Sequence, residues 1–461
     1  EELADQAGGK AALDADLLDE VTALCEWPTA MIGSFDQEFL EVPAEALVET
    51  MQKNQKYFPV HSASGELLPR FITVSNIRSQ DPEQVRAGNE RVIRPRFADA
   101  AFFWKQDLKK PFDHYATKLT QVVFQEKLGT IAEKSARVAQ ICRHLAGLLG
   151  ADEELCARSA YLAKCDLVTQ MIAEFPSLQG IMGRYYAERS GEDPCVSAAM
   201  EEQYLPRHAG DRLPQSDCGR ILSVADRLDT LIGIFSIGQR PTGVKDPYAL
   251  RRATIGLLRI LIETPLPLDL REVLEFAAQE LRDKVSVGDT AAEVFEYALE
   301  RLKGYYQDLG IGNDVVDAVL AVDVTVPSDI HRRILAVNQF RTLAEAESLT
   351  ASNKRIRNIL RKSGELGIIP NEPTTDALVE ESEKRLAARL AMLKERVAPL
   401  LAQQDYTGVL TTLAGLREDV DTFFDEVMVN VEDVGLRRNR LALLKSLESM
   451  FVGVADIARL Q

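Results

Sequence analysis

Cationic side chains gather in residues 238–261, which read GQRPTGVKDPYALRRATIGLLRIL. The segment holds five cations and one acid, Asp246, although the net charge of the chain is −17. Such a group is typical of phosphate recognition, because guanidinium and ammonium groups donate charge-assisted hydrogen bonds to anionic oxygens. The alternative is a set of solvated side chains that pair with acids of the same chain. The five cations are Arg240, Lys245, Arg251, Arg252 and Arg259.

A second cationic group lies in residues 351–362, which read ASNKRIRNILRK and contain five cations and no acid. A helix here buries the face of Ile356, Ile359 and Leu360. Polar side chains three and four positions apart then lie together on another face. The candidates for RNA contact on this helix are Lys354, Arg355, Asn358 and Lys362.

Aromatic and cationic residues follow one another in residues 423–440. Unstacked RNA bases are bound by aromatic rings, arginine planes and phosphate contacts, so this composition favours single-stranded RNA. The alternative places at least one of the two phenylalanines in the hydrophobic core. The candidates are Phe423, Phe424, Arg437, Arg438, Asn439 and Arg440.

The helical middle of the chain resembles an HD-type phosphohydrolase domain that has lost its histidine ligands. Such domains hold a metal with one histidine on an early helix, an adjacent His–Asp pair on a later helix and a final aspartate. Lys134 stands at the first position, Cys165 and Asp166 replace the pair, and Asp226 is the final aspartate. A protonated lysine does not coordinate a metal, and the remaining donors make a poor hydrolytic site. We therefore expect no metal and no catalytic residue in this chain.

Other catalytic patterns are absent from the sequence. There is no G-x-S-x-G nucleophile turn and no G-x-x-x-x-G-K-[ST] phosphate loop. The six cysteines form no C-x-x-C pair, which argues against a zinc knuckle or a disulfide framework. ATP chemistry therefore has no recognisable site in these residues.

Hydrophobic periodicity predicts a mainly α-helical, multidomain chain. Residues 1–115 form an α/β segment with a strand around 71–77, residues 116–265 a degenerate HD-like helical domain, and residues 266–345 a helical connector. The clearest helical period covers residues 122–150, and a further helix begins at Pro247 or Tyr248, with Asp246 as its cap. Residues 346–461 form a helical bundle that contains a loop at 363–375.

Charge and hydropathy limit the classes of partner. Residues 351–461 hold 16 Lys or Arg against 17 Asp or Glu, so the net charge lies almost entirely in the first 350 residues. An acidic protein of this kind binds RNA at local patches and is no general ligand of nucleic acid. No apolar run approaches the roughly 20 residues that span a bilayer. We expect a cytoplasmic protein that contacts neither membranes nor DNA.

Several long motifs resemble the beta subunit of bacterial heterotetrameric glycyl-tRNA synthetase. They are NQKYFPV, LAKCDLVTQM, VADRLDTLIGIF, PTG with KDPYALRR, NKRIRNIL, and FFDEVMVNVED with RRNRL. They occur in the order of that family and span nearly the whole chain. The beta chain of the family is longer at its N-terminus, so this sequence is expected to lack the first portion.

The resemblance implies a tRNA-binding subunit of glycine–tRNA ligase. The expected partners are the alpha subunit and tRNA(Gly), in an α2β2 heterotetramer in which ATP and Mg²⁺ belong to the alpha subunit. Residues 346–461 would form a DALR-type anticodon-binding domain, and Arg240, Lys245, Arg251, Arg252 and Arg259 would contact the tRNA body or the partner.

Three alternative functions compete with this one. One is an HD-type metal phosphohydrolase, which the missing histidines argue against. Another is a non-enzymatic RNA-binding scaffold. The third is a self-sufficient arginyl-type synthetase, which would need HIGH and KMSK motifs, and the sequence contains neither.

Overall fold

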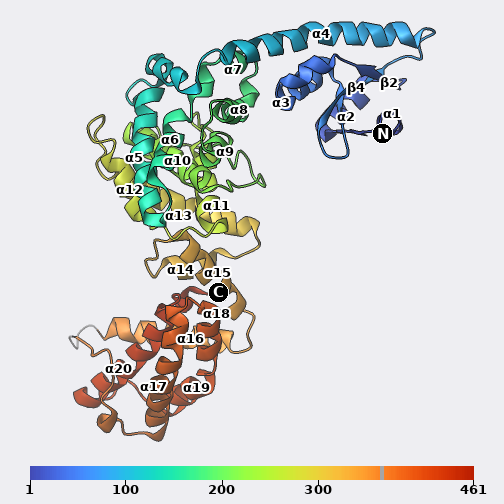
Figure 1. The fold of residues 1–461 in the computed structure, drawn as a ribbon. Helices are drawn as coiled ribbons and strands as arrows, with labels where there is room; N and C mark the ends of the chain where they lie inside the picture. The colour runs from blue at the N-terminus through green and yellow to red at the C-terminus, as the bar shows by residue number, and fades with distance from the viewer. Residues whose placement is uncertain (364–367) are drawn as a thin grey trace. The chain divides into compact units, whose positions relative to one another are not determined.

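The computed structural model describes residues 1–363 and 368–461 and is mainly α-helical, with a four-stranded sheet near the N-terminus and a two-stranded sheet further along the chain (Figure 1). The predicted fold class is thereby confirmed. The chain forms two compact units. The first contains residues 1–229 and 280–286, and the second contains residues 230–279 and 287–461.

The sheet of the first unit has four strands in the order β1-β3-β4-β2, and all neighbours are antiparallel. Alternating side chains of β3 and β4 enter a core that contains Phe58, Val60 and Ile72. The short helices around the strands complete this core with Leu17 and Val21. The elements are α1 (Glu2–Gln6), β1 (Lys10–Ala11), α2 (Ala15–Leu24), β2 (Thr29–Ser34), η1 (Gln37–Glu41), α3 (Ala44–Glu49), η2 (Thr50–Asn54), β3 (Phe58–His61) and β4 (Leu67–Ser75).

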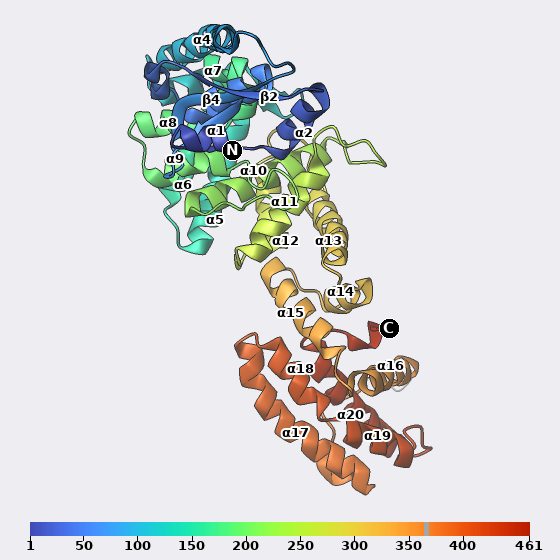
Figure 2. The same ribbon diagram turned by 90° about the vertical axis from the view of Figure 1, so that its right-hand side faces the viewer.

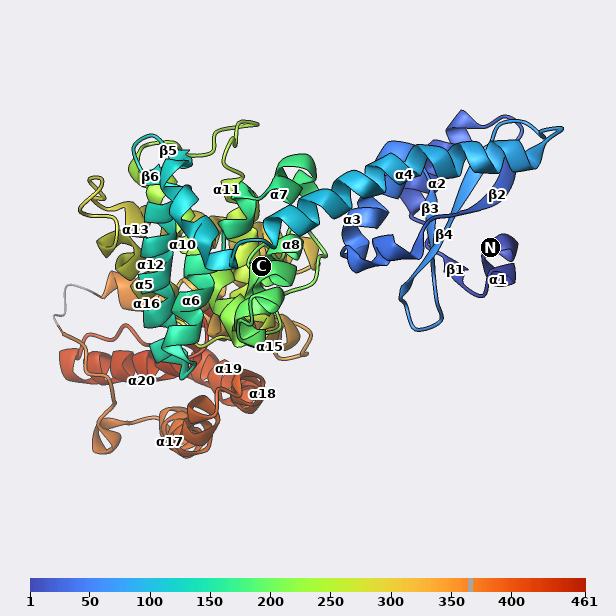
Figure 3. The same ribbon diagram turned by 45° about the horizontal axis from the view of Figure 1, so that its top comes forward.

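A long helix, α4 (Pro82–Asp107), follows the sheet and packs against β2 (Figure 3). Asp81 caps it by accepting a hydrogen bond from the Gln84 amide at 3.2 Å. Its buried positions, Ile93, Phe97 and Trp104, recur at helical spacing and so form one apolar face.

The helical prediction for residues 122–150 is wrong at its start. Residues 123–130 form a two-stranded hairpin of β5 (Val123–Gln125) and β6 (Gly129–Thr130), and α5 (Ile131–Leu149) begins only afterwards. Thr130 and Glu133 form a reciprocal capping box, which fixes the first turn of α5 at this point. Gly129 has a φ of +92°, a conformation that glycine adopts without steric cost.

Short helices surround α5 in the remainder of the first unit. Apolar side chains from α5 and α6 bury against each other, with Ile141, Leu145 and Ala157 among them. The last helix, α10, contributes residues to both units. The elements are η3 (Phe112–Gln121), α6 (Glu153–Leu162), η4 (Cys165–Val168), α7 (Gln170–Glu174), η5 (Pro176–Leu178), α8 (Ile181–Arg189), α9 (Pro194–Glu202) and α10 (Asp217–Ser236).

The second unit consists of helices (Figure 2). Helices α16 to α20 form a bundle at its C-terminal end, in which α16 packs on α19 and α20 and α17 packs on α18, α19 and α20. The elements are α11 (Leu250–Glu263), α12 (Leu270–Gln279), α13 (Thr290–Asp308), α14 (Asn313–Leu320), α15 (Pro327–Phe340), α16 (Ala346–Lys362), η7 (Thr375–Ala377), α17 (Glu381–Ala402), α18 (Tyr406–Ala414), α19 (Arg417–Glu426), α20 (Val434–Val452) and η8 (Ile457–Arg459).

The predicted loop at 363–375 includes residues 364–367, which lie outside the described residues. In the part of the chain that the structure describes, no helix is both long enough and apolar enough to cross a membrane. All six cysteines are free thiols, and Cys142, Cys156, Cys165 and Cys218 are buried.

Candidate functional site

A basic pocket of about 500 Å³ lies on the C-terminal bundle between α16 and α20. Among the residues that the structure describes, 1–363 and 368–461, no aspartate or glutamate lines it, so the described lining is positively charged. The lining residues are Ala351, Lys354, Arg355, Asn358, Ile359, Lys362, Ser363, Asn430 and Arg437. Five of the predicted RNA-contact residues therefore meet in one pocket.

Helical spacing brings four of these side chains together. Lys354, Arg355, Asn358 and Lys362 follow one another at intervals of one, three and four residues on α16, and all four are exposed. The opposite side of the helix is anchored by Ile356, which is fully buried. The pocket thus lies on a helix face that the core holds in place.

Arg355 lies over the ring of Phe424, with its guanidinium carbon 4.2 Å from the ring centroid. Phe424 is half-buried and packs edge-on against Phe423, which is fully buried, at a centroid distance of 5.4 Å. A guanidinium plane on an aromatic ring offers a flat cationic surface on which a nucleobase can stack. Phe423 supports this surface from the core and does not reach solvent.

One further side chain of the pocket was missed by sequence reasoning. Asn430 lines the pocket and carries an amide that can bond a base edge. Met428 is 73% exposed on the same turn between α19 and α20. The segment FFDEVMVNVED contains both residues, but only the fold shows which of its side chains leave the core.

Three predicted contacts require correction because their side chains are buried. Phe423 is core, Arg440 forms a buried ion pair with Glu383 and donates to the Met428 carbonyl, and Asn439 bonds both backbone groups of Thr374. These residues hold the bundle together. Arg438 remains exposed and donates to the Ile368 carbonyl, and Arg437 is half-buried in the pocket wall.

The segment around residue 246 forms a well-bonded loop that leads into α11. The Asp246 carboxylate accepts hydrogen bonds from the amides of Leu250 and Arg251 at 2.8 and 3.0 Å. Asp246 thus bonds the first two amides of α11, but the N-cap residue is Ala249, and the predicted helix start is wrong, since α11 begins at Leu250. Ala249 has a φ of +53°, which separates Pro247 and Tyr248 from the helix.

Three of the five cations in this segment have partners within the second unit. Arg240 pairs with Glu293, Arg251 donates to the Gly243 carbonyl, and Arg259 pairs with Glu263. The internal ion-pair alternative therefore holds for Arg240 and Arg259. Lys245 and Arg252 are exposed, and Arg240 is exposed as well although it pairs with Glu293.

Lys134 lies buried among acidic side chains in the HD-like frame. Its ammonium is 3.0 Å from Asp229 Oδ2 and 3.3 Å from Asp226 Oδ1, and it lies over the Phe124 ring. Burial opposes the charge of Lys134, but the two carboxylates outweigh it and raise its pKa. A permanent cation thus occupies the position that a first metal ligand would take, so these residues do not fit a metal ion.

The other positions of the frame are also structural. Asp166 is fully buried and accepts a hydrogen bond from the Gly180 amide at 2.6 Å, and burial raises its pKa to about 6. Burial raises the pKa of the Cys165 thiol to about 12, so it is not a thiolate ligand. Sequence reasoning missed Asp229, which is fully buried and also pairs with Arg137 at 2.6 Å. Among the described residues, no group of His, Cys, Asp and Glu could hold a metal.

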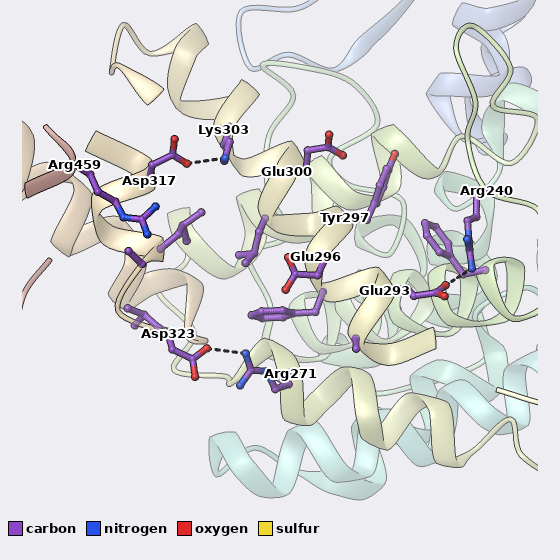
Figure 4. A pocket seen from close by; sticks show the side chains of 17 residues that line it. Arg240, Arg271, Glu293, Glu296, Tyr297, Glu300, Lys303, Asp317, Asp323 and Arg459 are labelled. Carbon is purple, nitrogen blue, oxygen red and sulfur yellow. Dashed lines mark hydrogen bonds and ion pairs between the residues drawn. The ribbon is translucent and has the colours of Figure 1, made fainter. Parts of the chain in front are cut away.

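A larger cavity of about 940 Å³ lies beside α13 (Figure 4). Its cations are paired with acids across the opening, as in Arg271–Asp323 at 2.8 Å and Lys303–Asp317 at 2.7 Å. Glu296 adds a negative charge to the rim. This cavity presents little uncompensated positive charge, so we consider the smaller basic pocket the better candidate for a polyanion.

Two family profiles match the chain. A family profile described as glycyl-tRNA synthetase beta subunit matches residues 1–321, and one described as DALR anticodon binding domain matches residues 349–455.

Curated relatives match over the full chain. The glycine–tRNA ligase beta subunit of Pseudomonas aeruginosa strain UCBPP-PA14 is 50% identical over 459 residues, which cover 100% of this chain and 67% of the relative. Those of Marinobacter nauticus and Chromohalobacter salexigens are 50% and 52% identical, covering 99% and 98% of this chain and 65% of each relative. The chain thus spans about two thirds of the length of these relatives.

Proposed function

Because the chain belongs to the glycyl-tRNA synthetase beta subunit family, we propose that it binds tRNA(Gly) and positions the acceptor end for ATP-dependent glycylation in an alpha subunit. The observation that carries the proposal is the basic pocket on α16 and α20, which lies within the anticodon-binding match at residues 349–455. Its cations supply phosphate contacts and the Arg355–Phe424 pair supplies a stacking surface.

The contribution to catalysis is positional. A tRNA held at its anticodon arm delivers its acceptor end at a high effective concentration, and proximity then accelerates the transfer step. We place ATP and Mg²⁺ at the alpha subunit, because this sequence has no phosphate-binding loop of the P-loop type. We further propose an α2β2 assembly in the cytoplasm, as in the bacterial family that the motifs resemble.

Base discrimination would come from the two amide side chains of the pocket. Asn358 and Asn430 carry both a donor and an acceptor, so each can form two hydrogen bonds with one base edge. The exposed Lys245 and Arg252 could add a contact to the tRNA body. The paired Arg240 and Arg259 contribute less to RNA binding, because an existing ion pair must be given up before phosphate is bound.

Substitution of Arg355 by alanine tests the proposal. Removal of the cationic layer over Phe424 should weaken tRNA(Gly) binding about tenfold, since one stacked base contributes about 1–3 kcal/mol. Binding is measured by fluorescence anisotropy, and glycylation with purified alpha subunit should show a raised KM for tRNA. ATP–pyrophosphate exchange with glycine reports activation in the alpha subunit and should not change.

Arg396→Ala is the matched control, because Arg396 is an exposed arginine of the same bundle on α17, away from the pocket. It should leave tRNA affinity unchanged. Equal affinities of the Arg355→Ala and unsubstituted chains for tRNA(Gly) would show that this pocket is not the RNA site.

A further inference from the structure

An exposed apolar patch lies where β2 begins and β4 ends. The antiparallel register ends at the pair Thr29–Ser75, and Trp27 and Ile77 each lie two residues beyond this pair. Trp27 is 69% exposed and Ile77 is 62% exposed. Leu24, the last residue of α2, is 63% exposed and lies three residues before Trp27. We refer to Leu24, Trp27 and Ile77 as the Trp27 patch.

The backbone beneath the patch is fixed by one side chain. The Asn76 amide oxygen accepts hydrogen bonds from the backbone amides of Glu26 and Trp27, at 2.7 and 2.9 Å. These two hydrogen bonds join the segment before β2 to the segment after β4, beyond the strand pair Thr29–Ser75. A tryptophan on a fixed backbone loses little conformational entropy on binding, and tryptophan is enriched among residues that dominate interface energy.

The charge around the patch is mainly negative, with Arg78 as the exposed cation directly after Ile77. Residues 11–52 contain ten Asp or Glu and no Lys or Arg. One cation near α2, Lys56, is already paired with Glu20 at 2.8 Å. A phosphate backbone would be repelled here, whereas a protein surface with an apolar centre and a rim of Lys and Arg would be complementary in both respects.

We propose that the Trp27 patch is a docking surface for the alpha subunit, on a face of that subunit with an apolar centre and a basic rim. The inference rests on the proposed function, because that function requires a second chain to supply the aminoacylation site. It uses a different region from the tRNA pocket, which lies on α16 and α20. The two can therefore be tested separately.

The chain carries its own probe for this contact. It has two tryptophans, and Trp104 is 4% exposed and stacks on Tyr186 at a centroid distance of 5.2 Å. The solvent-sensitive emission should therefore come from Trp27. On titration with the alpha subunit, this emission should shift to shorter wavelength and lose its quenching by acrylamide. A Trp27→Phe chain should lack both changes, which assigns them to Trp27.

Affinity for the alpha subunit gives the second measurement. Trp27→Ala should weaken the complex about 30-fold in analytical ultracentrifugation, the loss typical of an aromatic interface anchor. Val123→Ala is the matched control, because Val123 is 66% exposed in the first unit on another element, β5. It should leave the affinity unchanged. The affinity of Trp27→Ala for tRNA(Gly), measured without the alpha subunit, should equal that of the unsubstituted chain.

Three results would overturn the proposal. In the first, acrylamide still quenches Trp27 emission fully in the complex with the alpha subunit. In the second, Trp27→Ala binds the alpha subunit with unaltered affinity. In the third, tRNA alone protects Trp27 from quenching. A failure of the tRNA-binding proposal is recognised separately: Arg355→Ala would then bind tRNA normally while Trp27 still responds to the alpha subunit.

Discussion

At the scale of single residues, the middle of the chain shows how a lysine can replace a metal-site arrangement. Lys134 contacts two carboxylates and an aromatic ring within the buried space between α5 and α10. Lys164 approaches Asp226 from the other side at 3.6 Å. Asp226 and Asp229 would otherwise repel one another, but the ammonium groups of the two lysines neutralise them. Helices α5 and α10 are therefore joined without a metal ion.

Substitution of Lys134 by methionine should therefore destabilise the chain. It removes one partner of the fully buried Asp229, which keeps Arg137, and one partner of Asp226, which keeps Lys164, so the loss should be about 1–3 kcal/mol, the cost of a lost buried hydrogen bond. Urea unfolding followed by circular dichroism measures the loss. Lys127→Met is the control, because Lys127 is exposed on the adjacent turn. A loss no larger than that of the control would contradict the structural role.

Asp166 should make stability depend on pH. Burial raises its pKa from 3.8 to about 6, so the folded chain keeps a proton that the unfolded chain releases between about pH 4 and 6. Stability should therefore fall as pH rises through that window and change little above it. Two pKa units correspond to about 3 kcal/mol. Asp166→Asn cannot ionise, so relative to the unsubstituted chain it should gain about this amount between pH 4 and 7.

Urea midpoints at several pH values measure that difference. The gain belongs to residue 166 only if it accumulates between the ordinary pKa of 3.8 and the raised pKa of about 6 and levels off above it. A difference between the two chains that is constant from pH 4 to 7 would show that Asp166 keeps an ordinary pKa.

At the scale of elements, loops and helix starts fix where the candidate residues point. Asp246 holds the first amides of α11, and the Arg251 guanidinium returns to the Gly243 carbonyl. Thr242 and Lys245 exchange two backbone hydrogen bonds, at 2.8 and 3.0 Å, and so close the turn between them. The segment is therefore ordered by its own bonds.

Removal of the Asp246 carboxylate should destabilise the first turn of α11 locally. Asp246→Ala takes away the acceptor of the Leu250 and Arg251 amides, and loss of a cap costs about 1 kcal/mol. Hydrogen exchange of peptides that cover residues 246–252 should become about fivefold faster, which is that energy expressed as a rate. Asp246→Asn keeps a side-chain oxygen and should retain most of the protection. Identical exchange in all three chains would mean that the cap does not stabilise the loop.

Regular periodicity made much of the fold predictable. The mainly helical class, the strand near residues 71–77 and the basic face of α16 all depend on spacing within one element, which a sequence displays directly. The hairpin at 123–130 was missed because its apolar residues also fit a helical period. Its turn glycine and the capping box at Thr130 were the available signals.

Burial within the bundle could not be predicted in the same way. Arg437 lines the pocket, while Arg440 is buried against Glu383, although the two arginines are three residues apart on α20. Their difference arises from contacts with α17, which lies more than 30 residues earlier in the chain. Asp229 was missed for the same reason, since its partners Lys134 and Arg137 lie on α5.

At the scale of the whole molecule, the chain carries a net negative charge, and positive charge is concentrated at a few sites on it. The net charge of −17 disfavours general binding of nucleic acid. The basic pocket presents four cations and no acid among those of its lining residues that the structure describes. Binding of tRNA should therefore be local, and its salt dependence should report the few phosphates held there.

Substitution of Lys354 and Lys362 by alanine together should change this salt dependence. Each phosphate contact contributes about 0.7–0.9 to the slope of log affinity against log salt, so loss of two contacts should reduce the slope by about 1.5. The slope is measured by anisotropy with tRNA(Gly) between 50 and 300 mM potassium chloride, an interval set by the roughly linear range of such plots.

The control carries Lys384→Ala and Arg396→Ala, two exposed cations of α17, and so loses the same net charge from the same bundle. If affinity depended only on the total charge of the protein, both double variants would lower the slope equally. If the pocket holds phosphates directly, the Lys354 and Lys362 variant should lose the larger part, because contacts at the surface release counterions whereas distant charges are screened within about 10 Å. Equal slopes in the two variants would therefore contradict direct phosphate binding in the pocket.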